Sequence, residues 1–436
     1  MTRQYKDSGI EWIGQIPMDW KMQPLAIYFA ENSKSNSDLG SVNALQFKYG
    51  EIIQKPNNGK ELTDKDRELL EKYTVVSPDD IVVNGLNLNY DLKSLRIAKV
   101  REDGIITSAY IVLRPRNGAN ASFYNYYLKA LDFQKIFHGM GVGIRLTLSY
   151  DELRSMLLAV PSFEEQQRIA DYLDKKCAEI DGLIELQEQM IAQLTDYKQS
   201  VITEAVTKGL NPNATLVPSD VDWIEHIPLG WEIKPFKEIF RTGKGLSFTK
   251  ADLVNEGVPV ISYGQVHSKQ NSGTRIDDEL IRFVPNEITN GGDTSKVYVG
   301  DFIFADTSED LDGCGNCVYV DKEIGLYAGY HSVVAHSKRK KSNLYLAYLF
   351  LTNCWRSQIR CRVSGIKVFS ISQSIIKQAT IILPPVEEQI AIATYLNKKC
   401  TEIDNLIAAK QQKIEMLKDY KKSLIFECVT GKKEIN

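Results

Sequence analysis

Hydrophobic residues in two long stretches of the chain recur with the heptad spacing of a coiled-coil helix. Each stretch begins just after a proline and carries two glutamates in its first turn, where carboxylates meet the positive end of the helix dipole. A helix of about 40 residues is about 60 Å long, which suits a spacer between domains. The side chains expected to form the helix interface are Leu173, Ile180, Ile184, Ile191 and Leu194 in the first stretch and Leu396, Ile403, Ile407, Ile414 and Leu417 in the second.

Neither predicted helix can bury its apolar seam alone. The simplest solution pairs the two helices within the chain, so we expect an intramolecular coiled coil with antiparallel helices. This arrangement would give the chain pseudo-twofold symmetry and hold a domain at each end, at a fixed distance from the other. The heptads alone leave open the alternative that the helices merely join two ordinary domains.

The whole chain is built as an internal repeat. Residues 8–29 match residues 219–240 at one offset, which pairs Trp12 with Trp223 and Trp20 with Trp231. Residues 161–207 match residues 384–430 without a gap, and more than half of the positions are identical. The intervening segments are much less alike. We therefore divide the chain into a first globular domain at 1–160, a first long helix at 161–210, a second globular domain at 211–383 and a second long helix at 384–436.

The two dissimilar segments contain short runs of β-branched and aromatic residues bounded by turn residues, which is typical of strands. Examples are 81–83, 110–113 and 258–261, and both segments share an Asp followed by such a run, in SPDDIVVNG and VGDFIFADT. Helices are predicted between the strands at 123–137 and 343–359. The expected fold class is therefore α+β, with two globular domains separated by the paired helices.

The composition limits the possible classes of protein but does not indicate a function. The chain has 436 residues, 43% of them hydrophobic and 25% charged, and a net charge of −3, so any affinity for nucleic acid must come from local basic patches. We find no stretch apolar enough for a membrane helix and no signal-peptide core after Met1, which predicts a cytoplasmic protein without a membrane partner. Seven cysteines without a secretory signal are expected to be free thiols.

Motifs for catalysis are missing from the sequence. We find no Asn-Pro-Pro-Tyr methyltransferase motif, no Walker A motif and no protease or kinase signature, and the segment 242–245 lacks the glycine spacing of a phosphate loop. Cys314 and Cys317 have the spacing of a zinc pair, with Cys354 and Cys361 as further ligands, but the first half contains no counterpart, so we expect no metal. A nuclease would need an acidic metal cluster that we cannot locate.

These features together resemble one family, the specificity subunits of type I restriction-modification systems. The resemblance covers essentially the full length. It rests on Pro161 with Glu164-Glu165-Gln166, on Pro384 with Glu387-Glu388-Gln389, and on the Trp-Ile-x-x-Ile-Pro-x-x-Trp openings at Trp12 and Trp223. The presence of both motifs in duplicate makes the match specific.

The resemblance implies a non-catalytic DNA-recognition subunit. Each dissimilar segment would be a target recognition domain that recognises one half of a bipartite sequence in double-stranded DNA, and the helices would set the gap between the half-sites. It also implies partners: two methyltransferase subunits docked on the helices, and the restriction and translocase subunits. S-adenosylmethionine, ATP and magnesium would belong to those partners, and this chain would bind no cofactor.

Candidate DNA contacts are cations for phosphate groups and amide, hydroxyl or imidazole groups for base edges. Arg145 and Lys367 rank first because they occupy equivalent places, just after a glycine, in both halves. The alternative for each asparagine is a local backbone cap, and for each cation a solvated side chain. The remaining candidates are Asn84, Asn87, Asn89, Arg96, Lys244, Tyr263, Gln265, His267, Lys338, Arg339, Arg360 and Arg362.

One alternative function remains open at this point. A coiled-coil scaffold that binds only proteins would carry the same helices but show no sequence-selective DNA binding. The target bases and the gap between half-sites cannot be derived from the sequence.

Overall fold

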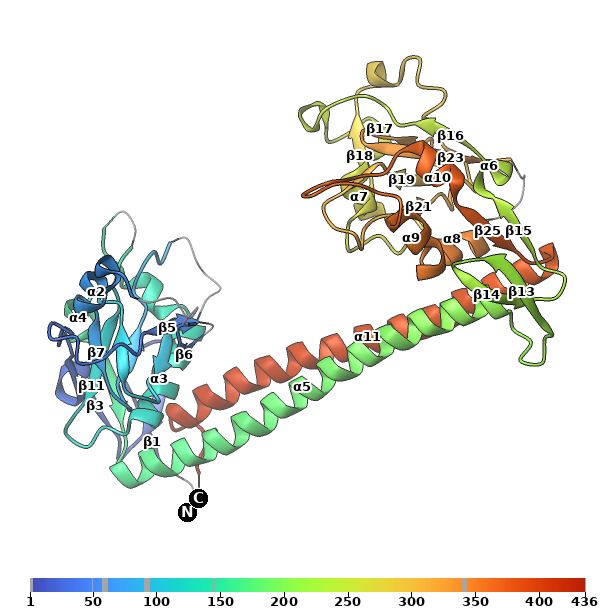
Figure 1. Ribbon diagram of the computed structural model, residues 1–436. Helices are drawn as coiled ribbons and strands as arrows, with labels where there is room; N and C mark the ends of the chain where they lie inside the picture. Colours follow the sequence, from blue (N-terminus) through green and yellow to red (C-terminus); the bar gives the residue numbers. More distant parts are fainter. Residues whose placement is uncertain are drawn as a thin grey trace. The chain divides into compact units, whose positions relative to one another are not determined.

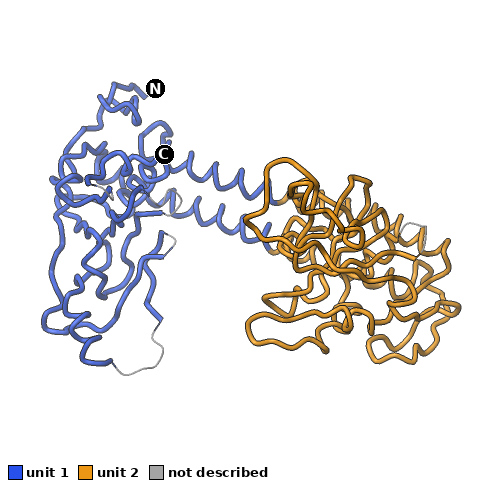
Figure 2. The backbone as a smooth tube through the Cα atoms, turned by 90° about the horizontal axis from the view of Figure 1, so that it is seen from above, with its two compact units in different colours: residues 1–188, 411–436 blue, residues 189–410 orange. Residues whose placement is uncertain are grey.

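A computed structural model describes residues 3–48, 50–56, 62–89, 95–143, 146–338 and 343–435. The chain forms two compact units: unit 1 contains residues 1–188 and 411–436, and unit 2 contains residues 189–410 (Figure 2). Two long helices, α5 (Phe163–Lys208) and α11 (Val386–Val429), contribute to both units (Figure 1). Arg145 and Arg339, two of the candidate DNA contacts, lie outside the described residues.

Unit 1 is organised around a four-stranded antiparallel sheet in the order β4-β11-β8-β9. These strands are β4 (Phe29–Glu31), β11 (Ile111–Pro115), β8 (Ile81–Val83) and β9 (Ile97–Lys99), and α3 (Ala121–Phe133) packs against β9. Two-stranded antiparallel pairs surround the sheet: β1 (Tyr5–Asp7) with β2 (Gln15–Pro17), β3 (Lys21–Pro24) with β12 (Leu157–Val160), β5 (Leu45–Lys48) with β6 (Glu51–Gln54), and β7 (Thr74–Val76) with β10 (Gly104–Ile106). The short helices are α1 (Leu25–Tyr28), α2 (Asp64–Glu71) and α4 (Tyr150–Leu153).

Unit 2 repeats this plan with a four-stranded antiparallel sheet in the order β16-β23-β19-β21. These strands are β16 (Phe240–Lys244), β23 (Ser332–Ser337), β19 (Phe302–Ala305) and β21 (Cys317–Tyr319). The pairs around it are β13 (Leu216–Val221) with β14 (Ile224–Pro228), β15 (Glu232–Pro235) with β25 (Thr380–Leu383), β20 (Thr307–Ser308) with β24 (Phe369–Ser370), and β17 (Val258–Ile261) with both β18 (Arg282–Val284) and β22 (Tyr327–Ala328). Its helices are α6 (Phe236–Ile239), α7 (Tyr263–Val266), α8 (Leu344–Phe350), α9 (Asn353–Arg360) and α10 (Gln373–Gln378).

The predicted helix at 343–359 is wrong in one respect, because two helices occupy this segment. Helix α8 ends at Phe350, and Thr352 has an extended backbone, with φ −88° and ψ 158°, before α9 begins. The Thr352 hydroxyl donates a hydrogen bond to the Leu349 carbonyl at 2.7 Å, which satisfies one of the last carbonyls of α8. The break lets the fully buried Trp355 of α9 pack on Phe350 of α8, with ring centroids 4.3 Å apart.

The long helices pair in antiparallel fashion within each unit. In unit 1, Lys421 of α11 forms an ion pair with Asp181 of α5, at 2.6 Å. In unit 2, Lys198 of α5 forms the corresponding pair with Asp404 of α11, at 2.7 Å. The sequence repeat aligns Asp181 with Asp404 and Lys198 with Lys421, so the two pairs are pseudo-symmetry mates.

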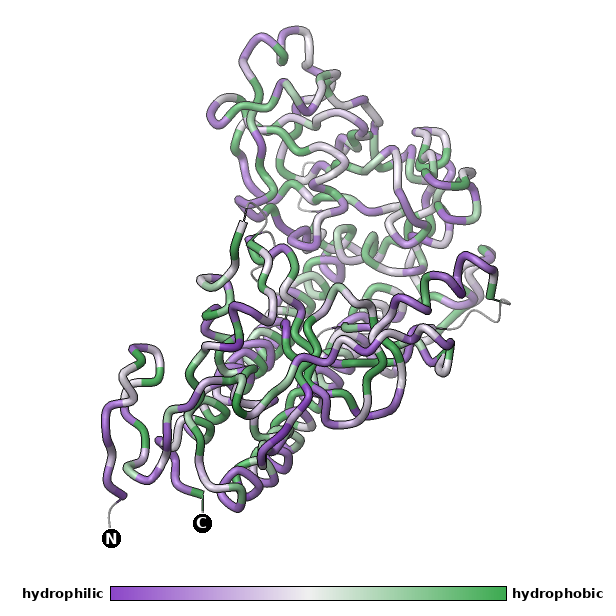
Figure 3. The backbone as a smooth tube through the Cα atoms, turned by 90° about the vertical axis from the view of Figure 1, so that its left-hand side faces the viewer, coloured by the Kyte–Doolittle hydropathy of each residue, from purple (hydrophilic) through white to green (hydrophobic). Residues whose placement is uncertain are grey.

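Each of the ten side chains proposed for the helix interface is buried or partly buried. Leu173, Ile180, Leu396, Ile403 and Ile414 are buried. The remaining five are only partly covered, because a two-helix pair leaves its flanks open: Ile184, Ile191, Leu194, Ile407 and Leu417. Hydrophobic and hydrophilic residues alternate in short stretches along the backbone (Figure 3). Within the described residues, no helix has both the length and the apolar character needed to cross a membrane.

Candidate nucleic-acid interface and its supports

The glutamine of the repeated Pro-Glu-Glu-Gln motif forms a hydrogen bond at the start of each long helix. Gln166 Nε2 donates to the Pro161 carbonyl at 3.1 Å, and Gln389 Nε2 donates to the Pro384 carbonyl at 2.7 Å. The strand before each motif pairs with the strand that follows the tryptophan opening, β12 with β3 and β25 with β15. The two repeated blocks of each half therefore meet at one place in each unit.

A tryptophan joins the two helices at that place. In unit 1, Trp20 Nε1 donates to Glu165 Oε2 at 3.0 Å, at the start of α5, and Gly431 follows the end of α11. A Cβ on Gly431, whose φ is +71°, would lie 3.1 Å from the Trp20 ring and 2.5 Å from Pro17. Glycine is therefore required here both by its left-handed backbone and by the close approach of the tryptophan.

Unit 2 builds the same arrangement from the other copy. Trp231 Nε1 donates to Glu388 Oε2 at 3.0 Å, and a Cβ on Gly209, whose φ is +77°, would lie 3.2 Å from the Trp231 ring. We call each tryptophan, glutamate and glycine set a helix clamp. Unit 1 adds one contact, because Arg3 Nη2 lies 2.7 Å from Glu165 Oε1, while the repeat places Ala214 at the matching position.

A buried aspartate precedes the central strand of each sheet. In unit 1, Asp80 accepts a hydrogen bond from the Ser77 amide at 3.1 Å and two from Arg114, from Nε at 2.9 Å and from Nη2 at 2.7 Å. Arg114 is in β11, next to β8 in the sheet. The bidentate geometry fixes the loop that leads into β8.

In unit 2 the matching aspartate pairs with a histidine. Asp301 accepts from the Tyr298 amide at 3.0 Å and lies 2.9 Å from His336 Nδ1, while His336 Nε2 lies 3.0 Å from the Thr294 carbonyl. Both ring nitrogens face acceptors, so the protonated imidazolium satisfies both contacts, whereas the neutral ring can satisfy only one of them. The hydrogen bond to Asp301 is the main cause that raises the pKa of His336, while burial lowers it.

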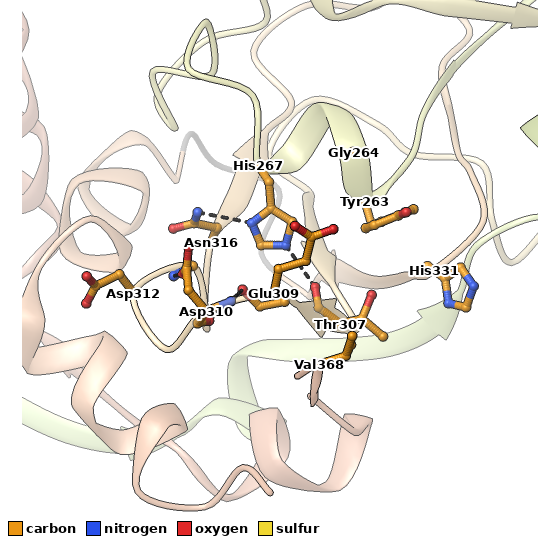
Figure 4. A pocket seen from close by; sticks show the side chains of 12 residues that line it. Tyr263, Gly264, His267, Thr307, Glu309, Asp310, Asp312, Asn316, His331 and Val368 are labelled. Carbon is orange, nitrogen blue, oxygen red and sulfur yellow. Dashed lines mark hydrogen bonds between the residues drawn. The ribbon is translucent and has the colours of Figure 1, made fainter. Parts of the chain in front are cut away.

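A cleft of about 750 Å³ opens in unit 2 and contains two of the predicted base-contacting residues, Tyr263 and His267 (Figure 4). His267 Nε2 lies 2.8 Å from the Thr307 carbonyl, which can only accept, so this nitrogen carries the proton. In the neutral ring, Nδ1 then accepts from Asn316 Nδ2 at 3.4 Å. Tyr263 meets His331 edge to face at 5.4 Å. The cleft thus holds aromatic faces beside polar groups of fixed orientation.

The third predicted residue of this group, Gln265, has a local partner. Its Oε1 accepts from the Ser262 amide at 3.1 Å and forms a capping box at the start of α7. Three carboxylates that the sequence analysis did not single out also line the cleft: Glu309, Asp310 and Asp312. Carboxylates accept from base amino groups and repel phosphate, so this cleft suits base edges better than the DNA backbone.

The structure contradicts a phosphate-binding role for Arg96. This residue is 2% exposed, and its Nη1 donates to the Asn84 carbonyl at 3.1 Å and to the Leu86 carbonyl at 2.9 Å. Arg96 therefore shapes the loop after β8 from inside. On that loop, Asn84 Oδ1 accepts from the Leu86 amide at 3.2 Å, whereas Asn87 and Asn89 are exposed, and Asn87 adopts a left-handed backbone with φ 51°.

The remaining predicted cations divide into two groups. Arg360 Nη2 donates to the Asp312 carbonyl at 2.9 Å, Lys338 Nζ donates to the Lys237 carbonyl at 2.7 Å, and Arg362 donates to the Gln358 carbonyl. Lys244 and Lys367 are exposed. Lys244 lines a second cleft that shares Thr307 and His331 with the first, so a cation lies next to the base-contacting candidates.

The two cysteines with zinc-pair spacing are both buried. Burial raises the pKa of Cys317 to about 12, which favours a neutral thiol. Across the described residues, no three His, Cys, Asp or Glu side chains gather in a way that could hold a metal ion.

Comparison with known proteins agrees with the duplicated architecture. The family model for the type I restriction modification DNA specificity domain matches residues 96–196 and 228–416. The chain is 23% identical to the type I restriction enzyme MjaVIII specificity subunit of Methanocaldococcus jannaschii, over 83% of this chain and 82% of that protein. It is also 23% identical to the putative MjaX specificity subunit of the same organism, over 96% of this chain and 95% of that protein.

Solved structures show the same fold at lower identity. One chain, described with the complex assembly and conformational transition of the type I R-M system, superposes with a TM-score of 0.70 at 14% identity and covers 95% of this chain and 98% of its own length. The HsdS subunit of Thermoanaerobacter tengcongensis superposes with a TM-score of 0.52 at 14% identity, with the same coverage. Because the family model spans more than half of the chain, in both halves, the chain belongs to the family of type I restriction modification DNA specificity domains.

Proposed function

We propose that this chain is the DNA sequence-recognition subunit of a type I restriction-modification complex and that each unit recognises one half of a bipartite target. The observation that carries this proposal is the repeated sheet, which has the same strand order in both units but different side chains at the end of its central strand. A constant frame with variable loops is how one fold presents different recognition surfaces.

In unit 2, the base-contacting side chains we propose are Tyr263 and His267, with the carboxylates of the same cleft. Lys244 and Lys367 are the proposed phosphate contacts, because both side chains are exposed. In unit 1, the base-contacting side chains we propose are Asn87 and Asn89, which are exposed in the loop after β8. Gln265, Arg360, Arg362 and Lys338 have partners within the protein and rank below these residues.

The helices offer two equivalent docking surfaces for protein partners. Leu183 and Tyr420 are exposed in unit 1, and their repeat mates, Leu406 and Tyr197, are exposed in unit 2, each between 45% and 55%. Exposed large apolar side chains in matching positions favour two copies of one partner. We assign these surfaces to two modification subunits. Methylation and cleavage, with S-adenosylmethionine, ATP and magnesium, then belong to the partner subunits, in the cytoplasm.

The proposed domain limits follow the repeat: recognition domains at 1–160 and 211–383, and spacer helices at 161–210 and 384–436. These limits can be tested by exchanging residues 241–383 for those of a relative. The chain is co-expressed with its modification subunit, and methylation of a random-sequence DNA library is mapped across a salt series. We expect a split motif with a fixed gap, and the exchange should change only one half of that motif.

Single substitutions refine this test. His267→Asn should relax one half of the motif and leave the other half unchanged, whereas His226→Asn, at an exposed histidine in β14, should change neither. If methylation shows no sequence preference even at low salt, where phosphate contacts are strongest, the protein-only scaffold is the better interpretation. Leu183→Asp or Leu406→Asp should each lower the number of bound modification subunits from two to one, as counted by native mass spectrometry.

A further inference from the structure

Unit 1 contains a polar pocket that the recognition residues discussed above do not share. Its volume is about 360 Å³, and it lies where β6, β9 and α3 meet the start of α5. Three cationic side chains line it, together with a serine, an asparagine and two carboxylates. The residues that matter for the argument are Lys99, Arg101, Ser122, Asn125, Lys129 and Asp174.

Both carboxylates of the pocket already have partners. Asp174 accepts a hydrogen bond from the Tyr126 hydroxyl at 2.8 Å, and Glu51 lies 3.9 Å from Arg101. Lys99 Nζ donates to the Ser122 hydroxyl at 2.7 Å and lies 3.4 Å from the exposed Asp79. The residues that line the pocket carry three positive and two negative charges, so one positive charge is in excess.

That charge is on Lys129. Among the described residues its ammonium group has neither an ion pair nor a hydrogen bond. Burial, followed by the nearby Lys421, lowers the pKa of Lys129. A covered ammonium without a partner costs free energy, so the pocket is incomplete without an anion.

Asn125 gives a second and independent indication of a ligand. The residue is 9% exposed, and its Oδ1 is buried without any hydrogen-bond donor. Native structures rarely leave such an atom unsatisfied unless a ligand or water completes it. By rotation of its amide, an asparagine can offer either an oxygen to a hydroxyl or an NH₂ group to a phosphate oxygen.

We propose that this pocket binds a phosphate group through Lys99, Lys129 and Asn125. A tetrahedral phosphate presents several acceptor oxygens, which matches a convergent set of two ammonium groups and one amide. The volume leaves room for the ester substituents of a nucleic-acid backbone. The phosphate is that of DNA if the recognition function proposed above holds, and free phosphate is the other source of the same chemistry.

The first arm of the test uses inorganic phosphate and the full chain bound to its modification subunit. Phosphate is titrated by calorimetry at constant ionic strength. Lys129→Met should weaken phosphate binding by at least tenfold, and Lys72→Met, at the exposed lysine just after α2, should leave it unchanged. Because Lys129→Met removes an unpaired charge, we expect the variant to melt at no lower temperature than the parent. Should it fail to fold, the isosteric Asn125→Asp, which places a negative charge in the pocket, makes the same prediction for phosphate.

The second arm identifies the source of the phosphate. DNA affinity is measured against salt concentration, and Lys129→Met should lower the slope of log K against log salt by about one, with the recognition motif unchanged. An unchanged slope with weakened phosphate binding supports a free-phosphate site. Absence of phosphate binding by the parent protein, together with an unchanged slope, overturns the proposal. If the protein binds phosphate but shows no sequence preference on DNA, the proposed recognition function is wrong, while the proposed phosphate site still stands.

Discussion

The two recognition sheets place the same carboxylate at the same point but pair it with different cations. Asp80 and Asp301 are both nearly inaccessible to solvent, and each accepts from the amide three residues earlier. The partner from the neighbouring strand is Arg114 in unit 1 and His336 in unit 2. Arginine stays charged throughout the accessible pH range, whereas histidine does not.

This difference shows which parts of the duplicated fold are held constant. The backbone frame needs an acceptor at the start of the central strand, because the amides of Ser77 and Tyr298 would otherwise lose their partners. The frame does not need one particular cation. The constant aspartate therefore supports the fold, while the variable partner changes how each unit responds to pH.

The largest expected effect comes from removing the constant member of each pair. Asp301→Ala should destabilise unit 2 by about 3 kcal/mol, because the largely covered His336 and at least one backbone amide lose their acceptor. Asp80→Ala should destabilise unit 1 by about 2 kcal/mol, because the Ser77 amide loses its acceptor while water can solvate the exposed Arg114. Hydrogen–deuterium exchange of the peptides containing β8 and β19 measures each unit separately. Glu256→Ala, at an exposed glutamate, is the matched control. Equal loss of protection in both units after a single substitution would contradict the comparison.

The helix clamps should differ by a smaller amount. Trp231→Phe removes the hydrogen bond to Glu388 and should cost about 1–2 kcal/mol. Trp20→Phe should cost less, because Arg3 still pairs with Glu165. Urea denaturation of the two variants gives the difference, and the double variant Arg3→Gln, Trp20→Phe should remove it. A greater cost for Trp20→Phe than for Trp231→Phe would show that packing, not the carboxylate, dominates the clamp.

The histidine pair should make unit 2 alone sensitive to pH. The pKa of His336 is raised in the folded protein by its hydrogen bond to Asp301. A raised folded pKa means that the stabilisation is complete below the ordinary histidine pKa of about 6.5 and is lost as pH rises through the folded value. Protection of unit 2 against exchange, corrected for the intrinsic pH dependence of exchange, should therefore fall relative to unit 1 on going from pH 6 to pH 9. His336→Arg should abolish this fall, and Arg114→His should introduce a similar fall in unit 1.

The ion pairs between the helices should contribute least. Lys421–Asp181 and Lys198–Asp404 lie at the surface, where such a pair is worth about 0.5 kcal/mol and is screened by salt. Lys198→Asp should lower the melting temperature slightly at low salt, and the added Asp404→Lys should restore it. Because the pairs are pseudo-symmetry mates, the same exchange at Lys421 and Asp181 should give the same small effect. A large effect at only one of the two ion pairs would contradict their equivalence.

Much of the architecture was accessible from the sequence because it depends on local patterns. The heptads and first-turn glutamates predicted the long helices, and the repeat predicted two similar halves. The shared Asp before a hydrophobic run also marked the central strand of each sheet. Fold class and family followed from these features, since helix periodicity and duplicated motifs require no knowledge of distant contacts.

The candidate site was less accessible because it depends on which side chains the fold brings together. Arg96 belongs to a basic cluster in sequence, yet burial turns it inward to hold a loop. Glu309 and Asn125 carried no sequence signal, because an exposed glutamate in a loop and an asparagine in a helix are common everywhere. Their interest comes only from the cleft and the pocket around them.

By itself, the sequence determined the repeat, the paired helices, the α+β class and the family, because these follow from periodicity and motif spacing along the chain. Only the tertiary structure decided which cation pairs with each strand-start aspartate, which arginine is buried and where an unpaired lysine meets an unsatisfied amide. Those outcomes depend on distances between residues far apart in sequence, and a side chain's charge acts only through what lies within a few ångströms of it.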